Sequence, residues 1–314
     1  MTIIPEKLSI HKPNKKLKET FDKIEIKEKI LFEEESNFHS IQVVKTDFGK
    51  FLKYSDTYQA GYINSKNYNG NIPYINYFLI PYLMNKNIKN ILFVGLGSGI
   101  IINQYEKIFD KLNKIDIVDI EENILNIAQN YFNFKLNKKI NFYLQDALVF
   151  LNTTKKKYDL IVVDVANNEG IDEKFCNKEY FKLIKSKLKK NGIFVSNMPS
   201  SRDIFNRKNK FVLNLIEIQK EFFNNILIFN GETSNKIFYK TFFNLDEVVL
   251  DVTNLILISS DKKYSLSKDY SILDKLNIDI KSYLDDLVWR KLPYFNKTEF
   301  AIALAVSSSW FVEK

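Results

Sequence analysis

The stretch Ile91-Leu-Phe-Val-Gly-Leu-Gly-Ser-Gly99 decides the fold of this chain. Its first four residues are apolar and predict a short buried strand, and three glycines then follow at alternate positions. Glycine allows a sharp turn with positive φ and lets a ligand approach the backbone. Beyond the turn, apolar residues recur near helical spacing from Ile101 to Leu112, so the turn opens a helix. A strand, a glycine turn and a helix N-terminus form a binding site for a polar ligand in an α/β sheet.

The spacing of the glycines narrows the class of ligand. The dinucleotide fingerprint Gly-x-Gly-x-x-Gly would place its third glycine at Ile100. This chain instead has Gly95, Gly97 and Gly99, with Ser98 between the last two. The form Gly-x-Gly-x-Gly resembles the nucleoside site of proteins that use S-adenosylmethionine, so we expect these four residues to lie against such a nucleoside.

A second predicted strand supports a nucleoside site. Ile115–Ile120 is apolar and carries Asp119 near its end, 20 residues after Gly99 (119 − 99). An acidic residue at about this distance is placed to accept hydrogen bonds from both ribose hydroxyls. The alternative role for any single acid at a strand end is a helix N-cap or a solvated loop residue.

Two further predicted strands also end in acids. Ile140–Leu144 is followed by Gln145-Asp146-Ala147, where Asp146 and Ala147 are placed to contact an adenine and its amino group. Tyr158–Asp164 predicts a buried strand that ends in a carboxylate. Ligands of open α/β sheets bind at the carboxyl ends of the strands, so these signals together favour a nucleoside site over separate helix caps.

Length and composition set the broad class. The chain has 314 residues, 45% of them hydrophobic, which is enough for one large or two smaller domains. It has no run of 18 apolar residues and its lysine-rich start lacks the apolar centre of a signal peptide, so we expect no membrane association. The lone Cys176 excludes an internal disulfide and fits a cytoplasmic location. No metal-ligand spacing is visible, so we expect no metal.

The net charge of +8 raises the question of a nucleic-acid partner. Along the chain the lysines look scattered, and the abundance of lysine, asparagine and isoleucine resembles coding bias. Lys155-Lys156-Lys157 reads as a solvated loop, and no basic stretch is interleaved with aromatic residues as in RNA-binding modules. We therefore expect no nucleic-acid partner.

The order of the predicted elements indicates two domains. Phe38–Val44 and Lys50–Tyr54 predict an antiparallel hairpin, and Tyr58–Ile63 predicts another strand, so residues 1–70 form a small β-rich lobe. Residues 71–314 then form a Rossmann-like α/β domain with a mostly parallel sheet covered on both faces. In this second domain we predict a helix at Pro73–Met84, which Pro81 kinks or ends early, and another helix at Arg207–Phe223. We also predict strands at Gly192–Asn197, Ile226–Phe229, Ile237–Tyr239 and Leu255–Ile258. The apolar end of the chain, Leu292–Val312, is expected to pack in the core.

These residues resemble the spermidine synthase family of polyamine aminopropyltransferases over roughly residues 30–310. In the first lobe, Glu35-Ser-Asn-Phe-His39-Ser-Ile41 is similar to the family's Glu-Ser-x-Tyr-Gln-x-Ile, and Leu52–Gln59 has the spacing of Leu-x-Leu-Asp-Gly-x-x-Gln. Tyr74 lies near the tyrosine of the family's Tyr-His-Glu. In the second domain, the stretch from Asp164 to Gly170 follows Asp-Ser-x-Asp-Pro-x-Gly, and Pro293–Asn296 resembles a terminal Tyr-Tyr-Asn segment.

Several positions depart from the family pattern. The family's glycine motif carries an aspartate that holds the cationic amine of decarboxylated S-adenosylmethionine, and Ser98 stands there in this chain. Asn167 replaces the second carboxylate of the Asp-x-x-Asp pair, His39 replaces a glutamine, and Ile75 replaces the histidine after Tyr74. The nucleoside half of the family's site is therefore kept and the amine half is altered.

The resemblance implies an S-adenosylmethionine-dependent transferase fold and a polyamine aminopropyltransferase activity. The donor is decarboxylated S-adenosylmethionine and the acceptor is putrescine or another small amine. Asp164 is the candidate base and Tyr74 its hydrogen-bonding partner, while Tyr74, His39 and Asn167 face the acceptor, and Gln59 joins the donor-binding residues. A cytoplasmic homodimer is expected. Two alternatives stay open, which are methyl or alkyl transfer from intact S-adenosylmethionine and a nucleoside-binding homologue without turnover.

Overall fold

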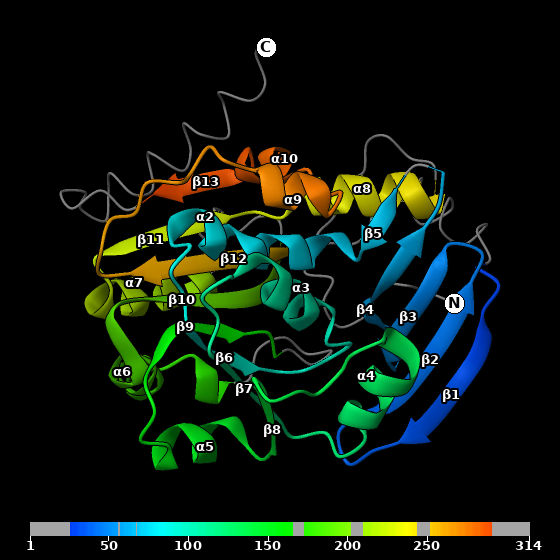
Figure 1. The fold of residues 1–314 in the computed structure, drawn as a ribbon, viewed down its shortest axis with the longest axis horizontal. Coiled ribbons are helices and arrows are strands. Elements are labelled where there is room, and N and C mark those ends of the chain that lie inside the picture. The colour runs from blue at the N-terminus through cyan, green and yellow to red at the C-terminus, as the bar shows by residue number, and fades with distance from the viewer. Residues whose placement is uncertain are drawn as a thin grey trace.

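The computed structural model describes residues 26–55, 57–66, 68–165, 173–201, 210–243 and 252–290. Two β-sheets organise these residues: a five-stranded antiparallel sheet near the N-terminus and an eight-stranded sheet that carries the glycine turn (Figure 1). The predicted α/β, Rossmann-like fold with a small β-rich N-terminal part is confirmed. The division into residues 1–70 and 71–314 stays a prediction, although the last strand of the first sheet ends at Asn71.

The N-terminal sheet is a meander in which each strand pairs with the next. Its strands are β1 Lys29–Glu35, β2 Ser40–Thr46, β3 Gly49–Tyr54, β4 Thr57–Asn64 and β5 Asn69–Asn71. The predicted hairpin is β2 and β3, with Val43 opposite Leu52, and both side chains are fully buried. The strand predicted at Tyr58–Ile63 is β4, whereas β1 lies in a charged stretch for which no strand was predicted.

The large sheet has the order β13-β11-β12-β10-β9-β6-β7-β8. Strands β6 to β11 run in one direction, and only β12 and β13 run the opposite way. Because β7 and β9 flank β6 on either side, the sheet has a switch point at the end of β6, where such folds bind their ligands. The strands are β6 Asn90–Val94, β7 Lys114–Asp119, β8 Ile140–Leu144, β9 Tyr158–Val163, β10 Leu188–Ser201, β11 Asn225–Phe229, β12 Val252–Ser260 and β13 Leu287–Arg290.

Helices cover both faces of this sheet and bury two separate apolar cores. Alternate residues of a strand point to opposite faces, so Ile91 and Phe93 of β6 join one core while Leu92 and Val94 join the other. The first core packs against η1 Pro73–Leu79, α2 Ile80–Met84, α3 Ile100–Ile108, α4 Ile124–Phe132, α8 Glu232–Phe243, α9 Ser271–Lys275 and α10 Ile280–Leu284. The second packs against α5 Ala147–Thr153, η2 Glu173–Phe175, α6 Lys178–Lys187 and α7 Lys210–Phe222. No helix of the described ranges is long and apolar enough to cross a bilayer.

Two predicted elements differ in the structure. The strand predicted at Ile237–Tyr239 is wrong, because these residues lie within helix α8. The carboxylate of Asp286 accepts hydrogen bonds from the Thr233 amide (2.7 Å) and hydroxyl (3.1 Å), so a residue distant in sequence satisfies the start of this helix. A short aromatic run cannot reveal such a partner.

The single helix predicted at Pro73–Met84 is also divided. The chain forms the 3₁₀ helix η1 and then the short α2, with Pro81 in the first turn of α2. Proline is tolerated there because the amides of a first turn have no intrahelical acceptor. Leu292–Val312, Asn167 and most of residues 1–29 lie outside the described residues.

The glycine turn yields a prediction about stability. Gly95 has φ +94°, and a Cβ there would lie 2.5 Å from the carbonyl oxygen of Asp164, whereas Gly97 has φ +51° and its Cβ would meet only Ala60 at 4.0 Å. We expect Gly95→Ala to lower the free energy of unfolding by roughly 3 kcal/mol or more, and Gly97→Ala by about 1–2 kcal/mol. Urea unfolding of both variants measures the difference, and equal losses would contradict the contact with Asp164.

Candidate active site

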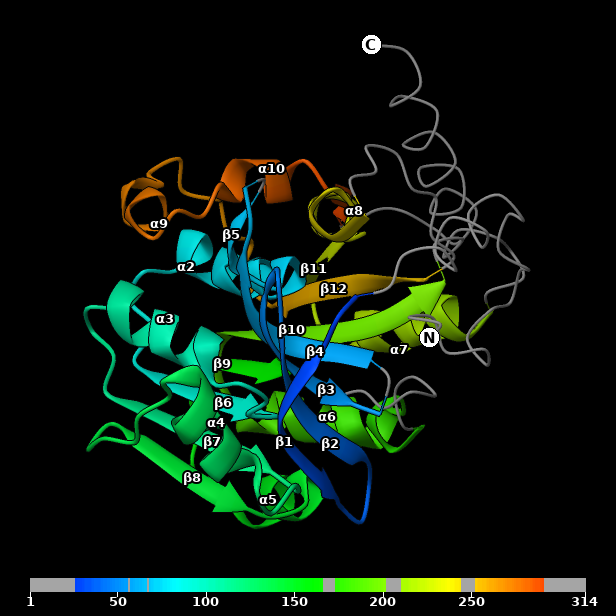
Figure 2. The ribbon, with the colours of Figure 1, turned by 90° about the vertical axis from the view of Figure 1, so that its right-hand side faces the viewer.

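The carboxyl ends of four adjacent strands bring the predicted site residues together. In the order β9, β6, β7 and β8, the strands lead into Asp164, Gly95, Asp119 and Asp146. The N-terminal sheet stands across this edge of the large sheet (Figure 2), and the Tyr74 hydroxyl of η1 lies within hydrogen-bond distance of Gln59 in the first sheet and of Asp164 at the edge of the second. The four predicted site residues therefore lie side by side along one edge of the large sheet.

Asp164 lies at the junction of the two sheets. Its carboxylate accepts hydrogen bonds from the Asn197 side-chain amide (3.0 Å) and from the Tyr74 hydroxyl (3.1 Å), and its own amide donates to the carbonyl of Val94 (3.0 Å). The same Tyr74 hydroxyl lies 3.0 Å from the carbonyl oxygen of Gln59, on β4. The structure thus brings Tyr74 and Asp164 into contact, and Gln59 takes part through its backbone.

The electrostatics of this contact define a proton acceptor beside a fixed donor. Burial raises the pKa of Asp164 above its ordinary value, although the hydrogen bonds from Asn197 and Tyr74 oppose the shift. Burial and the neighbouring Asp164 charge raise the pKa of Tyr74, so its hydroxyl stays protonated and donates. A carboxylate with a raised pKa is a better base than an exposed one, which suits it to proton removal.

Asn197 is a site residue that the sequence did not single out. It is 5% exposed, and its carbonyl oxygen Oδ1 has no hydrogen-bond partner among the residues described. Its position at the end of the predicted strand Gly192–Asn197 is the signal that could have identified it, because that strand lies next to β9. A buried acceptor without a partner costs free energy unless a ligand donates to it.

Asp119 holds the glycine turn in place. One carboxylate oxygen accepts from the Leu96 amide (2.6 Å) and the other from the Glu121 amide (2.9 Å). Burial raises the pKa of Asp119, these amide bonds oppose the shift, and the charge of Glu121 adds to it. Each oxygen keeps a second lone pair, so the predicted bonds to a ribose remain compatible with this geometry and stay a prediction.

Asp146 is the N-cap of α5, which is the alternative role that the sequence left open. Its carboxylate accepts from the amides of Leu148 (2.8 Å) and Val149 (3.2 Å) and pairs with Lys174 (3.3 Å). Burial raises the pKa of Asp146, but the two amides and Lys174 together hold it below its ordinary value. Ala147 is the first residue of α5, and the contact of Asp146 and Ala147 with an adenine stays a prediction.

The N-terminal sheet adds an aromatic pair to the site, and the loop after β7 adds another acid, Glu121. The rings of His39 and Tyr54 stack with centroids 4.7 Å apart and an interplanar angle of 10°. Burial and the charges of Asp119, Glu121 and Asp164 raise the pKa of Tyr54, while burial lowers the pKa of His39 and Glu121 opposes that shift. Tyr54 and Glu121 were not among the predicted site residues. Glu121, together with Asp119 and Asp164, makes this edge acidic, which favours cationic ligands.

Ser98 and an exposed apolar surface complete the edge. Ser98 is 3% exposed and precedes Gly99, which caps α3. Beside Asp119, the side chains of Ile120, Leu144 and Val149 are 44%, 52% and 48% exposed. Large apolar side chains at the mouth of a polar site are typical of a surface that binds a flat apolar group. Within the described ranges, no three His, Cys, Asp or Glu side chains gather as metal ligands would.

The comparisons with known proteins agree with this architecture. A family model described as the spermine/spermidine synthase domain matches residues 78–229. A polyamine aminopropyltransferase of Buchnera aphidicola subsp. Acyrthosiphon pisum is 24% identical over 272 residues, which are 80% of this chain and 92% of that protein. One from Methanocaldococcus jannaschii is 30% identical over 177 residues, 54% of this chain and 58% of that protein.

A crystal structure of spermidine synthase from Thermotoga maritima has the same fold, with a TM-score of 0.63 at 12% identity over 90% of this chain and 89% of that one. The sheet order, the glycine turn and the N-terminal sheet define a Rossmann-like transferase of the S-adenosylmethionine-dependent class. Within that class, the chain is similar to the spermine/spermidine synthase family.

The raised pKa of Asp164 predicts a pH dependence of stability. In the folded state the Asp164 carboxyl keeps its proton up to a higher pH than in the unfolded state, where its pKa is near 3.8. Stability from this group is therefore lost as the pH rises from about 4 through the raised pKa. We expect the stability of Asp164→Asn, relative to wild type, to increase over the same window and then level off. Urea midpoints from pH 3.5 to 8 measure it, and Asp110→Asn, at an exposed site, is the control that should follow wild type.

Proposed function

We propose that this protein transfers the aminopropyl group of decarboxylated S-adenosylmethionine to an amine acceptor, putrescine or another polyamine. The observation that carries the proposal is the half-buried Asp164, held by Tyr74 and Asn197 at the switch point of the sheet. Similarity to polyamine aminopropyltransferases supports the same reaction. This contact places a proton acceptor, Asp164, beside a hydrogen-bond donor, Tyr74, at the edge of the sheet where a ligand binds in this proposal.

The donor binds along the ends of β6, β7 and β8 in this proposal. Asp119 accepts hydrogen bonds from the ribose while it also holds the Leu96 amide. The adenine lies on the exposed side chains of Ile120 and Leu144, which are neighbours because Leu144 pairs with Asp119 across the two strands. Gly95, Gly97, Ser98 and Gly99 let the sulfonium end approach the backbone, and Gln59, Asp146 and Ala147 line the rim.

The reaction is an in-line displacement at the carbon beside the sulfonium. An ammonium has no lone pair, so the acceptor first gives one proton to the Asp164 carboxylate. The free amine then forms a C–N bond as the C–S bond breaks, and the sulfur leaves as neutral methylthioadenosine. Tyr74 orients Asp164 by its hydrogen bond, and fixing the two reactants side by side supplies much of the remaining acceleration.

Charge selects the substrates. Both the sulfonium donor and the protonated acceptor are cationic, and the charges of Asp119, Glu121 and Asp164 all act on Tyr54 and raise its pKa. This acidic edge draws cations toward the reacting atoms. His39 and Asn167 complete the acceptor side, and Asn167 carries one charge fewer than the aspartate that the family has there. Because one charge that would pair with a diamine is missing, the acceptor need not be putrescine.

A second candidate, methyl or alkyl transfer from intact S-adenosylmethionine, has one observation in its favour. Ser98 is neutral, so the glycine turn does not repel the carboxylate that the intact donor carries. The proposal also includes a cytoplasmic homodimer, supported by the single cysteine and by the usual organisation of the family that the chain resembles.

Incubation with each donor and a panel of polyamines, followed by mass spectrometry, tests the proposal. We expect an aminopropyl group to move in the wild type, and Asp164→Asn to lower the rate by about 10²–10⁴ while binding of methylthioadenosine stays within about threefold. Asn keeps the shape but cannot accept the proton. Asp110→Asn is the control. Wild-type turnover in Asp164→Asn, or transfer of a methyl group, would contradict the proposal.

Ser98→Asp tests what selects the donor. An aspartate at this turn attracts the free ammonium of the decarboxylated donor and repels a carboxylate, and each such pair is worth a few kcal/mol at an effective dielectric near 20. We expect the affinity ratio of decarboxylated to intact donor to rise at least about tenfold in competition calorimetry. Ser98→Asn is the uncharged control of similar size. An unchanged ratio would place Ser98 away from the amine end of the donor.

A further inference from the structure

Lysines are concentrated at the edge of the large sheet opposite the candidate active site. Six short segments lie at this edge, and together they hold sixteen lysines and two aspartates, a net charge of +14, whereas the whole chain carries +8. The rest of the chain is therefore net negative. The segments, here called the lysine edge, are 85–90, 109–114, 133–139, 154–157, 185–192 and 261–264.

The topology explains why segments far apart in sequence share one edge. Five of them lead into β6, β7, β8, β9 and the paired part of β10, which run in the same direction, so their amino ends align. The sixth follows β12, which runs the opposite way and ends with Ser260 opposite Ile193 of β10. The scattered appearance of the lysines along the chain thus becomes a cluster in space.

Direct contacts join neighbouring segments into one surface. The Asn113 amide donates to the carbonyl of Lys89 (2.7 Å), and the ammonium of Lys187 donates to the carbonyl of Thr154 (2.7 Å). Other contacts of the same kind are Ile115 amide to Lys139 carbonyl (2.9 Å), Lys114 ammonium to Lys138 carbonyl (2.6 Å) and Tyr264 hydroxyl to Asn191 carbonyl (2.7 Å).

Three acids near this surface, Asp116, Asp159 and Asp261, are paired with its lysines. Asp159 pairs with Lys189 (2.9 Å) and also accepts from the amides of Lys89 and Asn90, while Asp261 pairs with Lys185. Asp116 pairs with Lys156 at 2.8 Å. Within the described part of the chain, twelve lysines of the edge have no acidic partner. Of these, Lys111, Lys114 and Lys187 donate hydrogen bonds to neutral oxygens. The other nine ammonium groups have no hydrogen-bond acceptor among the residues described, namely those of Lys89, Lys135, Lys138, Lys139, Lys155, Lys157, Lys190, Lys262 and Lys263. Their charge is available to an external anion.

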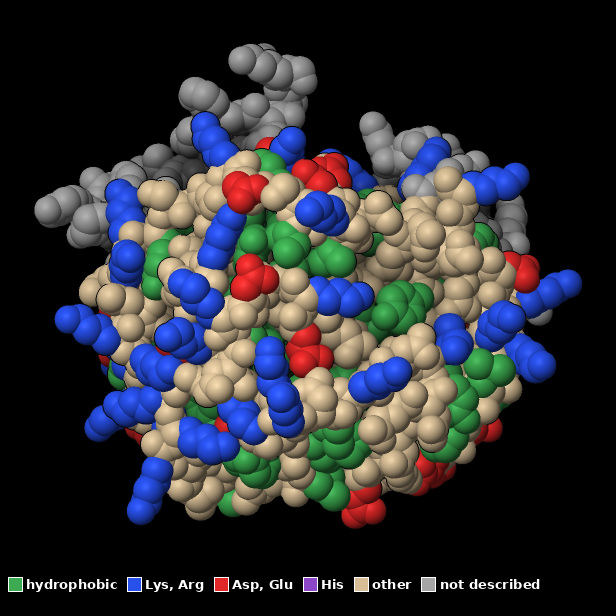
Figure 3. Space-filling model, in the orientation of Figure 1, with side chains coloured by type: hydrophobic (Ala, Val, Ile, Leu, Met, Phe, Trp, Pro, Cys, Tyr) green, Lys and Arg blue, Asp and Glu red, His purple; other side chains and the backbone are tan. Residues whose placement is uncertain are grey.

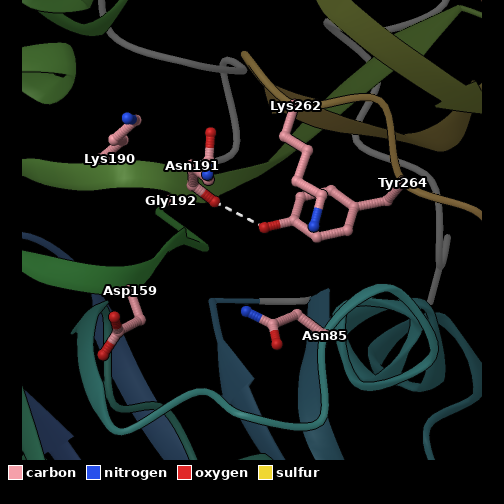
Figure 4. A pocket seen from close by; sticks show the side chains of 7 residues that line it. All are labelled: Asn85, Asp159, Lys190, Asn191, Gly192, Lys262 and Tyr264. Carbon is pink, nitrogen blue, oxygen red and sulfur yellow. Dashed lines mark hydrogen bonds between the residues drawn. The ribbon is translucent and has the colours of Figure 1, made fainter.

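A polar cavity opens among three of the segments. It has a volume of about 220 Å³ and is lined by Asn85, Asp159, Lys190, Asn191, Gly192, Lys262 and Tyr264 (Figure 4). The ammonium of Lys262 lies 4.9 Å from the centre of the Tyr264 ring. The cavity is smaller than the roughly 300–1,000 Å³ of pockets for drug-sized ligands, and it suits one phosphate-sized group. Figure 3 shows lysines gathered on the left and lower left of the molecule, where these segments lie.

We propose that the lysine edge binds the phosphate backbone of double-stranded nucleic acid without sequence preference. The edge spans six strand ends, about 24 Å at 4.8 Å per strand. A duplex carries one negative charge per ≈ 1.7 Å when both strands are counted, so a length of about 24 Å carries about 14 phosphate charges, and those on its near side can pair with the lysines of the edge. The inference goes beyond the proposed function and does not depend on it, because the edge and the candidate active site lie at opposite ends of the same strands.

A lipid surface is the less suitable partner. Peripheral membrane surfaces combine basic residues with exposed large apolar side chains that enter the bilayer. Of the exposed large hydrophobic residues in the described ranges, only Leu136 belongs to the lysine edge. Phosphodiester charges need no such insertion, so the composition of the surface favours nucleic acid.

Fluorescence anisotropy with labelled 20-base-pair RNA and DNA duplexes, from 50 to 300 mM salt, tests the proposal with the full chain. The test variant replaces Lys155, Lys157, Lys190 and Lys262 by Gln. The control variant replaces Lys27, Lys29, Lys45 and Lys66 by Gln; these four are exposed in or beside the N-terminal sheet, and the net charge changes equally. We expect the test variant to bind at least about tenfold more weakly and to reduce the salt slope by about 3–4, and the control variant to bind like wild type.

Three results would overturn the proposal: equal weakening in both variants, a wild-type affinity that does not fall with salt, or tighter binding to vesicles of anionic lipid than to either duplex. The salt slope of the wild type is informative even if the test variant does not fold. Tighter binding to one of the two duplexes would show whether the edge prefers RNA or DNA, and either preference supports the proposal that it binds a duplex. Methylthioadenosine should not displace the duplex, because the site proposed for the nucleoside lies at the other edge of the sheet.

Discussion

The hydrogen bond between the Tyr74 hydroxyl and the Asp164 carboxylate is the interaction on which the site depends. Tyr74 lies in the first turn of η1, and its hydroxyl also reaches the backbone of Gln59 in the N-terminal sheet. Asp164 in turn follows β9 and crowds the backbone of Gly95, where no side chain fits. One polar contact therefore fixes the N-terminal sheet, the glycine turn and the candidate base relative to one another.

Charge is distributed to match this arrangement. Glu121, Asp119 and Asp164 lie at the carboxyl edge of the sheet, while the loops at the amino edge carry most of the excess lysine. Since long-range fields attract or repel before contact, a cationic amine is drawn to one edge and a polyanion to the other. The two ends of the same strands thus serve ligands of opposite charge without competing for space.

Much of the fold was predictable because it depends on local patterns. The run Ile91–Val94 followed by spaced glycines predicts a strand and a turn, and the apolar residues of Lys50–Tyr54 predict one strand of a hairpin. The strand predicted at Ile237–Tyr239 failed, because a helix started there by Asp286 depends on a residue about fifty positions away. Asp146 shows the same limit, since a strand-end acid can cap a helix or face a ligand, and the sequence pattern is identical.

The sequence by itself determined the class of the fold, its switch point and which strand ends carry acids, because strand and turn signals are local. Only the tertiary structure decided which partners those acids have. Asn197 and Tyr74 donate hydrogen bonds to Asp164, the Leu96 amide donates to Asp119, and the charges of three carboxylates act on Tyr54. It also decided that lysines spread over nearly 180 positions form one surface. The reason is physical, since parallel strands align all their amino ends at one edge, whatever the distance between them along the chain.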